Sequence, residues 1–285
     1  MPKLAENPVG PRVVNGSSTG KPLPYQLQIR LDDRNTGCSA VLISPRFALS
    51  AHHCTHDIGI GITDSTLAAG VYTRLDKAKI GQVRQIKDIK QLHHTNGQAQ
   101  KTNDPDIVVI EVNEPFEMNE FVRPACLPAR QVLPSETCIV SGWGRILNEA
   151  KVDKGSDLDL QAAKVDMVHN DDGSYCKKFW NHPKFDGYPS VYVGDHTLCV
   201  FDQDSSGCPG DSGGPLVCGT SGGATIHGIV SFGDHDCHNR DEAPYQTYPW
   251  IVVNVFHFID QIESIIVRQN PKTFLHSVTF ILEYM

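Results

Sequence analysis

A serine in the stretch Gly210-Asp211-Ser212-Gly213-Gly214-Pro215 is placed where it could act as a nucleophile. Its small neighbours leave backbone N–H groups bare, and such groups can stabilise negative charge on an attacked carbonyl oxygen. A serine hydroxyl is a poor nucleophile near neutral pH unless a histidine takes its proton and a buried carboxylate orients that histidine. The stretch therefore predicts acyl-transfer chemistry, provided that both partners occur elsewhere in the chain.

Candidates for both partners lie upstream, in the chain order His, Asp, Ser. His53 follows the apolar run at 40–43, and Asp106 precedes the β-branched run at 107–110, which is typical of a buried strand. Each residue alone has a simpler interpretation, because a histidine beside a cysteine is often structural and an aspartate before a strand is often a turn residue. Together with Ser212 they predict a catalytic triad.

Seven short segments along the chain carry a resemblance to a known family. They are Val13-Val14-Asn15-Gly16, Ala51-His52-His53-Cys54, Asp106-Ile107-Val108-Val109, Pro124-Ala125-Cys126-Leu127-Pro128, Cys138-Ile139-Val140-Ser141-Gly142-Trp143-Gly144, Gly210 to Pro215, and Gly228-Ile229-Val230-Ser231-Phe232-Gly233. In this order they resemble the trypsin/chymotrypsin-like serine proteases, over about residues 13–269. The resemblance implies that His53 is the general base and acid, that Asp106 orients it and that Ser212 is the nucleophile. It also implies an oxyanion hole formed by the backbone N–H groups of Gly210 and Ser212.

The resemblance implies an all-β fold of two six-stranded antiparallel β-barrels with a C-terminal helix, and with the triad in the cleft between the barrels. We expect the first barrel over residues 13–124 and the second over 125–253, after a propeptide remnant at 1–12. Apolar residues at helical spacing predict the terminal helix over 254–270, packed on the second barrel. The tail at 271–285 has no readable role.

Composition excludes several other classes of protein. A chain of 285 residues can bury a substantial core, and its net charge of −8 disfavours nucleic acid as a partner because a polyanion would be repelled. No apolar run approaches the length of about 18 residues that a membrane span requires, so we expect a soluble protein. We expect no cofactor and no metal, because the histidine groups 52/53/56 and 235/238 lack a complete ligand set.

Nine cysteines without zinc-type Cys-x-x-Cys pairs indicate disulfides and an oxidising, extracellular compartment. The resemblance implies four disulfides among the other eight cysteines and assigns no partner to Cys126. In many relatives the matching cysteine is bridged to a propeptide or upstream segment. Residues 1–12 contain neither a cysteine nor the apolar core of a secretory signal, so we expect the natural chain to begin further upstream. A free or buried thiol is the alternative. The disulfides that the resemblance implies are Cys38 with Cys54, Cys138 with Cys218, Cys176 with Cys199, and Cys208 with Cys237.

The bond between Arg12 and Val13 resembles an activation cleavage site. The resemblance implies that cutting releases the ammonium group of Val13, which turns inward and pairs with Asp211. Because an unpaired buried carboxylate is costly, this pairing can order the oxyanion loop, and the uncut chain is expected to be a zymogen. An activating protease is therefore an expected partner. The stretch Asn15-Gly16-Ser17 is also a glycosylation sequon.

The expected specificity pocket departs from the trypsin pattern. Ser206 occupies the position at which trypsin-like members carry an aspartate that binds Lys or Arg, and Gly207 follows it. This uncharged floor, with Gly233 on one wall, resembles the chymotrypsin-like arrangement for large apolar side chains. On the opposite wall Trp250 replaces a glycine and would restrict the pocket to small residues or block it. Ser231, beside the pocket, matches the residue that hydrogen-bonds the triad carboxylate.

These patterns predict a secreted serine endopeptidase that hydrolyses peptide bonds through an acyl-enzyme. Protein or peptide substrates and protein inhibitors are the expected partners, and apolar or small side chains are favoured over basic ones. The alternative is a non-catalytic homologue that acts as a binding or regulatory protein. The unusual pocket favours that alternative, whereas the complete set of triad residues disfavours it.

Overall fold

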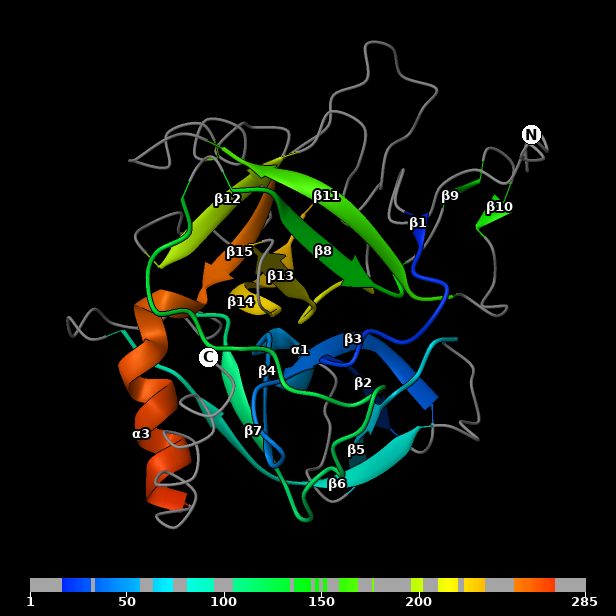
Figure 1. Cartoon of the computed structure of the whole chain (residues 1–285), viewed down its shortest axis with the longest axis vertical. Helices are drawn as coiled ribbons and strands as arrows, with labels where there is room; N and C mark the ends of the chain where they lie inside the picture. The colour runs from blue at the N-terminus through cyan, green and yellow to red at the C-terminus, as the bar shows by residue number, and fades with distance from the viewer. Residues whose placement is uncertain are drawn as a thin grey trace.

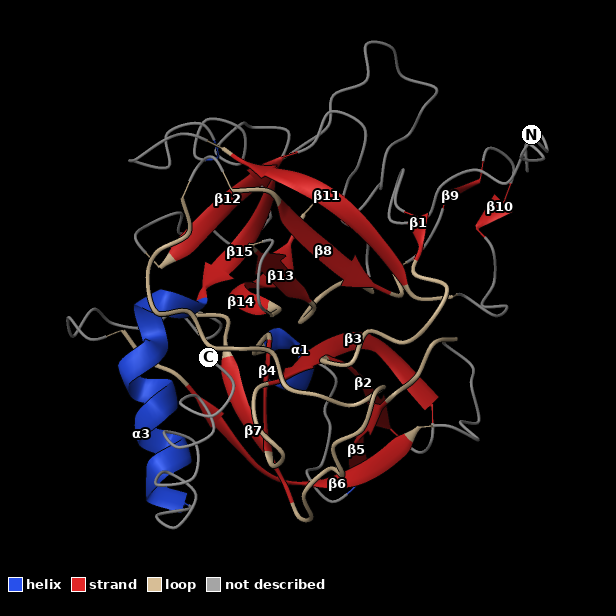
Figure 2. Cartoon of the chain, in the orientation of Figure 1, coloured by secondary structure: helices blue, strands red, loops and turns tan. Residues whose placement is uncertain are grey.

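The computed structural model arranges the chain as two β-barrels with a helix beside them (Figure 1). Each barrel is a closed ring of six antiparallel strands, so the expected all-β fold is confirmed. Figure 2 shows the two groups of strands one above the other, with helix α3 along one side. The structure describes residues 17–31, 34–56, 64–73, 81–94, 105–133, 136–144, 147–148, 151–152, 159–168, 176, 196–201, 210–219, 223–233 and 249–269.

The first barrel has the strand order β2-β3-β4-β7-β6-β5. Two of its strands, β4 and β7, are buried along their whole length because both are nearly continuous apolar runs. They pair antiparallel, with Ser50 at the end of β4 opposite Val108 at the start of β7. This register brings the residues after β4 next to those before β7. The bounds are β2 (Gln26–Leu31), β3 (Arg34–Leu42), β4 (Phe47–Ser50), β5 (Ser65–Ala69), β6 (Gln82–Gln91) and β7 (Val108–Val112).

The second barrel has the strand order β8-β11-β12-β15-β14-β13 and closes where β13 pairs with β8. Buried and more exposed residues alternate along β11, as expected for a strand with one face on the core. Buried aliphatic side chains fill the interior, among them Val140, Val165, Leu216 and Val252. The bounds are β8 (Cys138–Gly142), β11 (Gln161–Met167), β12 (Thr197–Phe201), β13 (Pro215–Cys218), β14 (Thr225–Phe232) and β15 (Trp250–Asn254).

Four short elements complete the described strands and helices of the barrels. The strand β1 (Ser17–Ser18) pairs with β11, so the segment that precedes the first barrel adds to the edge of the second. The strands β9 (Leu147–Asn148) and β10 (Lys151–Val152) pair with each other. The helix α1 (His53–His56) is a single turn that directly follows β4 and begins at the predicted base.

The C-terminal helix lies on the first barrel rather than on the second, contrary to the sequence-based expectation. A 3-10 turn, η3 (Val255–Phe258), leads from β15 into α3 (Ile259–Gln269). The Gln261 side chain accepts a hydrogen bond from the backbone N–H of His93 at 3.1 Å and donates one to the His93 carbonyl at 2.7 Å. Ile262 is fully buried in the cluster that contains the first-barrel core. Helix α3 therefore packs against the end of β6, beside β7 in Figure 1, and buries its apolar face there.

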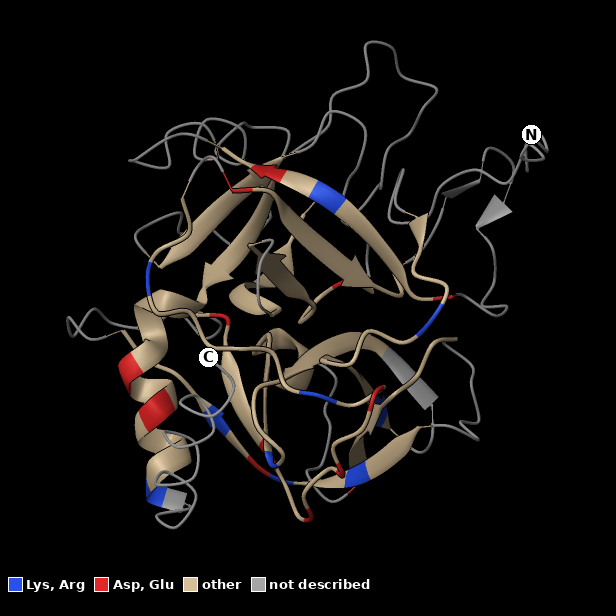
Figure 3. Ribbon diagram, viewed as in Figure 1, with Lys and Arg blue, Asp and Glu red and all other residues tan. Residues whose placement is uncertain are grey.

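Charged residues lie on strands of the first barrel, on β11 of the second barrel and along α3 (Figure 3). Several are paired, as in the contacts of Lys87 with Glu111 and of Arg130 with Glu136, each 2.7 Å long. Ion pairs at the surface contribute only about 0–1 kcal/mol each, so the buried strands supply most of the stability. No helix among the described residues is both long and apolar enough to cross a membrane.

Disulfides join segments that are distant in the chain. Within the described residues the bonds are Cys38–Cys54, Cys138–Cys218 and Cys176–Cys199, which are three of the four pairs that the family resemblance implies. The fourth expected pair, Cys208 with Cys237, lies outside the described residues. Cys126 is exposed and carries a free thiol.

Candidate active site

The pairing of β4 with β7 brings His53 and Asp106 together. His53 opens α1 just after β4, and Asp106 lies just before β7. The Nδ1 atom of His53 is 2.8 Å from Oδ2 of Asp106, and the backbone N–H of His53 donates to the other carboxylate oxygen at 2.8 Å. The carboxylate thus holds both the ring and the main chain of the histidine. An ionised carboxylate can only accept, so Nδ1 donates and the neutral ring keeps its lone pair on Nε2.

The second barrel contributes a third member to this network. The hydroxyl of Ser231, in β14, donates to Oδ2 of Asp106 at 2.5 Å. Burial raises the pKa of Asp106, but the hydrogen bonds and charge of His53 and the hydroxyl of Ser231 together outweigh burial and hold that pKa below its ordinary value. Asp106 is therefore ionised at neutral pH, as a residue that orients and stabilises a histidinium must be.

The loop that carries Ser212 is anchored between the two barrels. The carbonyl of Ser212 accepts from the backbone N–H of Ser39 in β3 at 2.8 Å, and Gly213 donates to the carbonyl of Val230 in β14 at 2.8 Å. Gly213 has a φ of +75°, and a Cβ there would lie 2.2 Å from the Ser39 carbonyl oxygen. Only glycine permits this close approach. Gly210 has a φ of +112°, so the turn before the serine also uses a backbone conformation that favours glycine.

Asp211, next to the serine, is buried with 3 % of its surface exposed. Its Oδ1 atom accepts from the backbone N–H of Gly144 at 2.9 Å. A Cβ on Gly142 would lie 2.2 Å from a carboxylate oxygen, and one on Gly144 would lie 2.4 Å from the other. Sequence reasoning did not assign this role to the two glycines, although they bracket the buried Trp143 in a Gly-Trp-Gly triplet. The expected partner of the carboxylate, Val13, lies outside the described residues, as does Arg12.

Trp250 is buried in the second barrel, with 2 % of its surface exposed. It lies opposite Val200 in the register of β15 with β12, and it belongs to the same cluster as Val230, the neighbour of Ser231. Among the described residues its indole Nε1 has no hydrogen-bond partner, which is uncommon for a buried donor. The expected floor of the pocket at 206–207 lies outside the described residues, whereas Gly233 follows the end of β14.

Comparison with known proteins places this arrangement in a family. The family model described as Trypsin matches residues 13–260. The chain therefore belongs to the trypsin family. Among curated members it is 29 % identical to Kallikrein-15 of Homo sapiens over 252 residues, which cover 85 % of this chain and 86 % of that protein. It is 27 % identical to Alpha-fibrinogenase albofibrase of Trimeresurus albolabris over 241 residues, which cover 84 % of this chain and 81 % of that protein.

A third relative of this trypsin-family chain is much longer. Transmembrane protease serine 9 of Rattus norvegicus is 29 % identical over 228 residues. The match covers 78 % of this chain and only 20 % of that relative. The likeness thus concerns about one fifth of that relative. The membrane attachment that its name records is a property of the relative.

Proposed function

We propose that this trypsin-family chain is a serine endopeptidase that hydrolyses peptide bonds through an acyl-enzyme. The observation that carries the proposal is the hydrogen-bonded series Ser231, Asp106 and His53, which presents a basic Nε2 lone pair. Membership of a family whose curated relatives are named as proteases supports it further. The buried, ionised carboxylate of Asp106, which accepts a hydrogen bond from Nδ1 of His53, would stabilise the imidazolium that proton transfer creates.

In this mechanism the hydroxyl oxygen of Ser212 attacks the carbonyl carbon of the scissile peptide bond. Nε2 of His53 takes the hydroxyl proton, while the backbone N–H groups of Gly210 and Ser212 stabilise the developing oxyanion. His53 then gives the proton to the leaving amine, and the C–N bond breaks to leave an ester on Ser212. Water, deprotonated by the same nitrogen, hydrolyses the ester and restores the serine.

Active-site labelling with a fluorophosphonate tests the proposal. We expect the processed chain to become labelled on Ser212, and the variants Ser212→Ala and His53→Ala to lose the labelling. The competing function is a non-catalytic homologue that binds partners, which the bulk of Trp250 at a pocket position favours. A correctly folded and processed chain that takes up no label would support that binding function and refute the enzyme.

We propose that the pocket accepts apolar or small side chains rather than basic ones. Ser206 and Gly207 supply no negative charge for a Lys or Arg side chain, and by the family likeness Trp250 would add bulk on the wall opposite Gly233. A peptide-library cleavage profile measures this preference. Trp250→Gly should shift cleavage toward larger side chains, and Trp250→Phe serves as the control that keeps an aromatic ring. An unchanged profile in the glycine variant would remove Trp250 from the specificity pocket.

We propose that cleavage after Arg12 activates the enzyme. The new ammonium group of Val13 would pair with the buried Asp211, the residue before the nucleophile, and order the oxyanion loop. In this assignment residues 1–12 are a propeptide remnant, and 13–124 and 125–253 are the two barrel units. Mass spectrometry combined with an activity assay tests the assignment. Full activity while residues 1–12 remain joined to Val13 would contradict it.

We propose that the protein is secreted and that Cys126 is bridged to an upstream segment. Three disulfides within the described residues fit an oxidising compartment, and the thiol of Cys126 is exposed enough to form a further bond. Mass spectrometry of the protein from its natural source, without reduction, should detect a second peptide attached at Cys126. An unmodified thiol in that material would refute the bridge.

A further inference from the structure

A pocket on the second barrel has no role in the proposed catalytic mechanism. It is lined by residues of the segment 127–137 and of the hairpin that β13 and β14 form. Its volume is about 520 Å³, within the range of about 300–1,000 Å³ that is typical of ligand sites. The pocket is therefore large enough to hold a small molecule or a side chain of a bound peptide.

The imidazole of His227, in β14, lines this pocket. Only 5 % of the surface of His227 is exposed, and within the described residues neither nitrogen of its ring takes part in a hydrogen bond. A buried polar group without a partner is uncommon, because it has lost its bonds to water and gained none in return. A ligand in the pocket would supply the missing bond.

The carboxylate of Glu136, which also lines the pocket, is already engaged. Its Oε1 accepts from Nη2 of Arg130 at 2.7 Å, and its Oε2 accepts from Nη1 at 2.9 Å and from the backbone N–H of Leu133 at 2.7 Å. These bonds lower the pKa of Glu136 to about 2, so this group stays ionised and balances the charge of Arg130. Arg130 gives a third N–H to the carbonyl of Gln131 at 2.9 Å, which within the described contacts leaves two of its five N–H groups for other acceptors.

The polar groups that remain open in the pocket are chiefly donors. They are the two remaining N–H groups of Arg130, the ring of His227, and the hydroxyls of Thr137 and Thr225, which also make no hydrogen bond within the described residues. Once His227 is protonated, its ring donates through both nitrogens and the lining carries a net positive charge. A carboxylate accepts from such donors through charge-assisted hydrogen bonds, which are about twice as strong as bonds between neutral groups.

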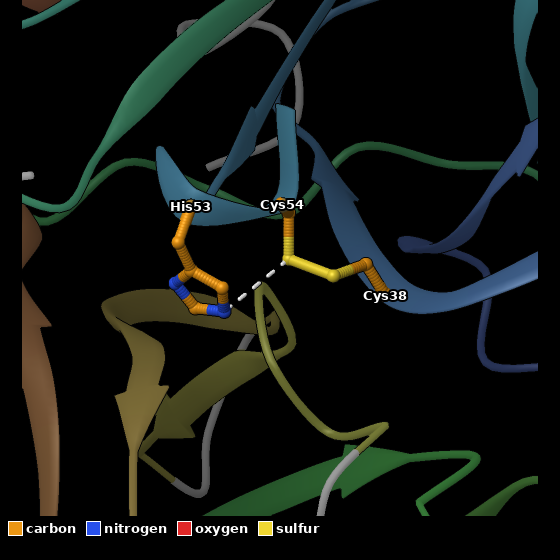
Figure 4. A group of neighbouring side chains, drawn as sticks. All are labelled: Cys38, His53 and Cys54. Atoms are coloured by element: carbon orange, nitrogen blue, oxygen red, sulfur yellow. Dashed lines mark hydrogen bonds between the residues drawn. A yellow bond between two sulfur atoms is a disulfide. The ribbon is translucent and has the colours of Figure 1, made fainter. Parts of the chain in front are cut away.

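The exposed thiol of Cys126 lies beside the pocket. A Cβ added to Gly223, which lines the pocket, would be 3.7 Å from Sγ of Cys126. The backbone of Cys126 also pairs with that of Thr225, another lining residue. The remaining described cysteines are joined in disulfides, as Figure 4 shows for Cys38 and Cys54. A peptide joined to Cys126 would therefore start next to Gly223, where glycine places no side chain between the sulfur and the pocket.

From this lining we propose that the pocket binds a carboxylate side chain of a peptide that a disulfide joins to Cys126. His227 and the remaining N–H groups of Arg130 would donate to that carboxylate, beside the ion pair of Arg130 with Glu136. The identity of the peptide as an upstream segment rests on the proposed function, whereas the preference for a carboxylate does not.

The bridge would form by thiol–disulfide exchange. The thiolate of Cys126 attacks one sulfur of a disulfide in the peptide, and a new S–S bond forms as the old one breaks. The other sulfur leaves as a thiolate and takes up the proton that Cys126 lost. One disulfide replaces another, so the step needs no further oxidant.

Binding of the carboxylate should take up a proton at His227. The charged groups of the lining that face its ring are Glu136 and Arg130. Burial lowers the pKa of His227, the charge of Glu136 raises it and that of Arg130 lowers it, which leaves the pKa below its ordinary value. A carboxylate in the pocket would raise that pKa. Binding should therefore strengthen as the pH falls from about 7 to about 5, where a glutamate side chain is still ionised.

Competition between two peptides for Cys126 in the full chain tests the site. N-acetylated dipeptide amides of cysteine with glutamate and of cysteine with glutamine share the same thiol and nearly the same shape, so the ratio of their mixed disulfides reports on the side chain. Both are offered at equal concentration in a mild thiol–disulfide buffer, and the bound peptides are then released by reduction and quantified by chromatography. Cys126→Ser, treated in the same way, gives the background. We expect the glutamate peptide to be favoured about 5- to 10-fold at pH 6, the usual advantage of a charged over a neutral acceptor, and less at pH 8.

Two histidine variants locate the preference. His227→Ala should bring the ratio of the two peptides close to one, whereas His93→Ala, which removes an exposed histidine of the first barrel, should leave the ratio unchanged. A ratio near one in the unaltered chain, or an unchanged ratio in His227→Ala, would overturn the proposal.

Titration of the ring of His227 by nuclear magnetic resonance needs no variant that could misfold. The pKa of His227 should be higher with the glutamate peptide attached to Cys126 than with the glutamine peptide, and equal pKa values would refute the site. If the protein from its natural source carries an unmodified thiol at Cys126, the bridge to an upstream segment fails, while the peptide ratio still decides whether the pocket binds a carboxylate.

Discussion

Replacing Gly144 with alanine is predicted to displace the buried carboxylate of Asp211. The added Cβ would lie 2.4 Å from Oδ2 and 2.6 Å from both Cγ and Oδ1, all within the range that real Cβ atoms do not reach. Either the carboxylate or the loop must move, and the hydrogen bond from Gly144 N–H to Oδ1, now 2.9 Å, is then lost. A hydrogen bond to a charged group contributes about 1.5–3 kcal/mol, and overpacking costs a further 1–3 kcal/mol, so we expect a loss of about 2.5–6 kcal/mol.

A double-mutant cycle measured by urea unfolding with intact disulfides isolates this contact. Gly144→Ala should cost much less in a chain that already carries Asp211→Ala, because no carboxylate remains to be displaced. Gly219→Ala is the control, because its Cβ meets no atom within 4 Å and its φ of +98° imposes backbone strain alone. Its cost should be the same with or without Asp211. An equal cost of Gly144→Ala in both backgrounds would refute the steric reasoning.

Three further predictions concern other contacts of the two barrels. Ser231→Ala removes a hydroxyl that lowers the pKa of the Asp106 carboxyl, so the variant should have a higher pKa at that group. Fluorophosphonate labelling should then be slower, most strongly at acidic pH. An unchanged pH profile of labelling would contradict the contact. Hydrogen bonds from Arg130 and from a backbone N–H lower the pKa of Glu136 to about 2, so stability should be complete above about pH 4.5 and fall as the pH drops toward 2. Glu136→Gln should flatten that part of a denaturation-against-pH curve, and an equally steep fall in the variant would refute the linkage. Ile262→Ala should lower the free energy of unfolding in urea by about 2–5 kcal/mol, because it leaves a cavity at a fully buried site under α3. Ile265 is only half-buried, so Ile265→Ala should cost less. Equal costs of the two variants would argue against the described packing.

Local patterns in the sequence predicted much of the secondary structure around the site. The apolar runs before His53 and after Asp106 lie in β3 and β7, and the helical spacing near the C-terminus became η3 and α3. These signals succeed because a strand buried on both faces is a continuous apolar run, whereas a helix buried on one face repeats its apolar residues about every 3.6 positions. The side of the molecule that α3 covers was not predicted correctly, since it depends on a partner at His93, far away in the chain.

By itself, the sequence determined the kinds of chemical group available, their order along the chain and the strands that flank them. Only the tertiary structure decided which groups meet. The hydroxyl of Ser231 reaches a carboxylate 125 positions earlier, and the glycines on either side of Trp143 make room for Asp211, because strand registers in two closed barrels bring these distant residues together. Three of the four disulfide pairs expected from family likeness alone are likewise joined in the folded barrels. Sequence alone could not have chosen them, because eight candidate cysteines allow about 105 pairings. Contacts of this kind depend on the summed geometry of many strands, which no short stretch of residues encodes.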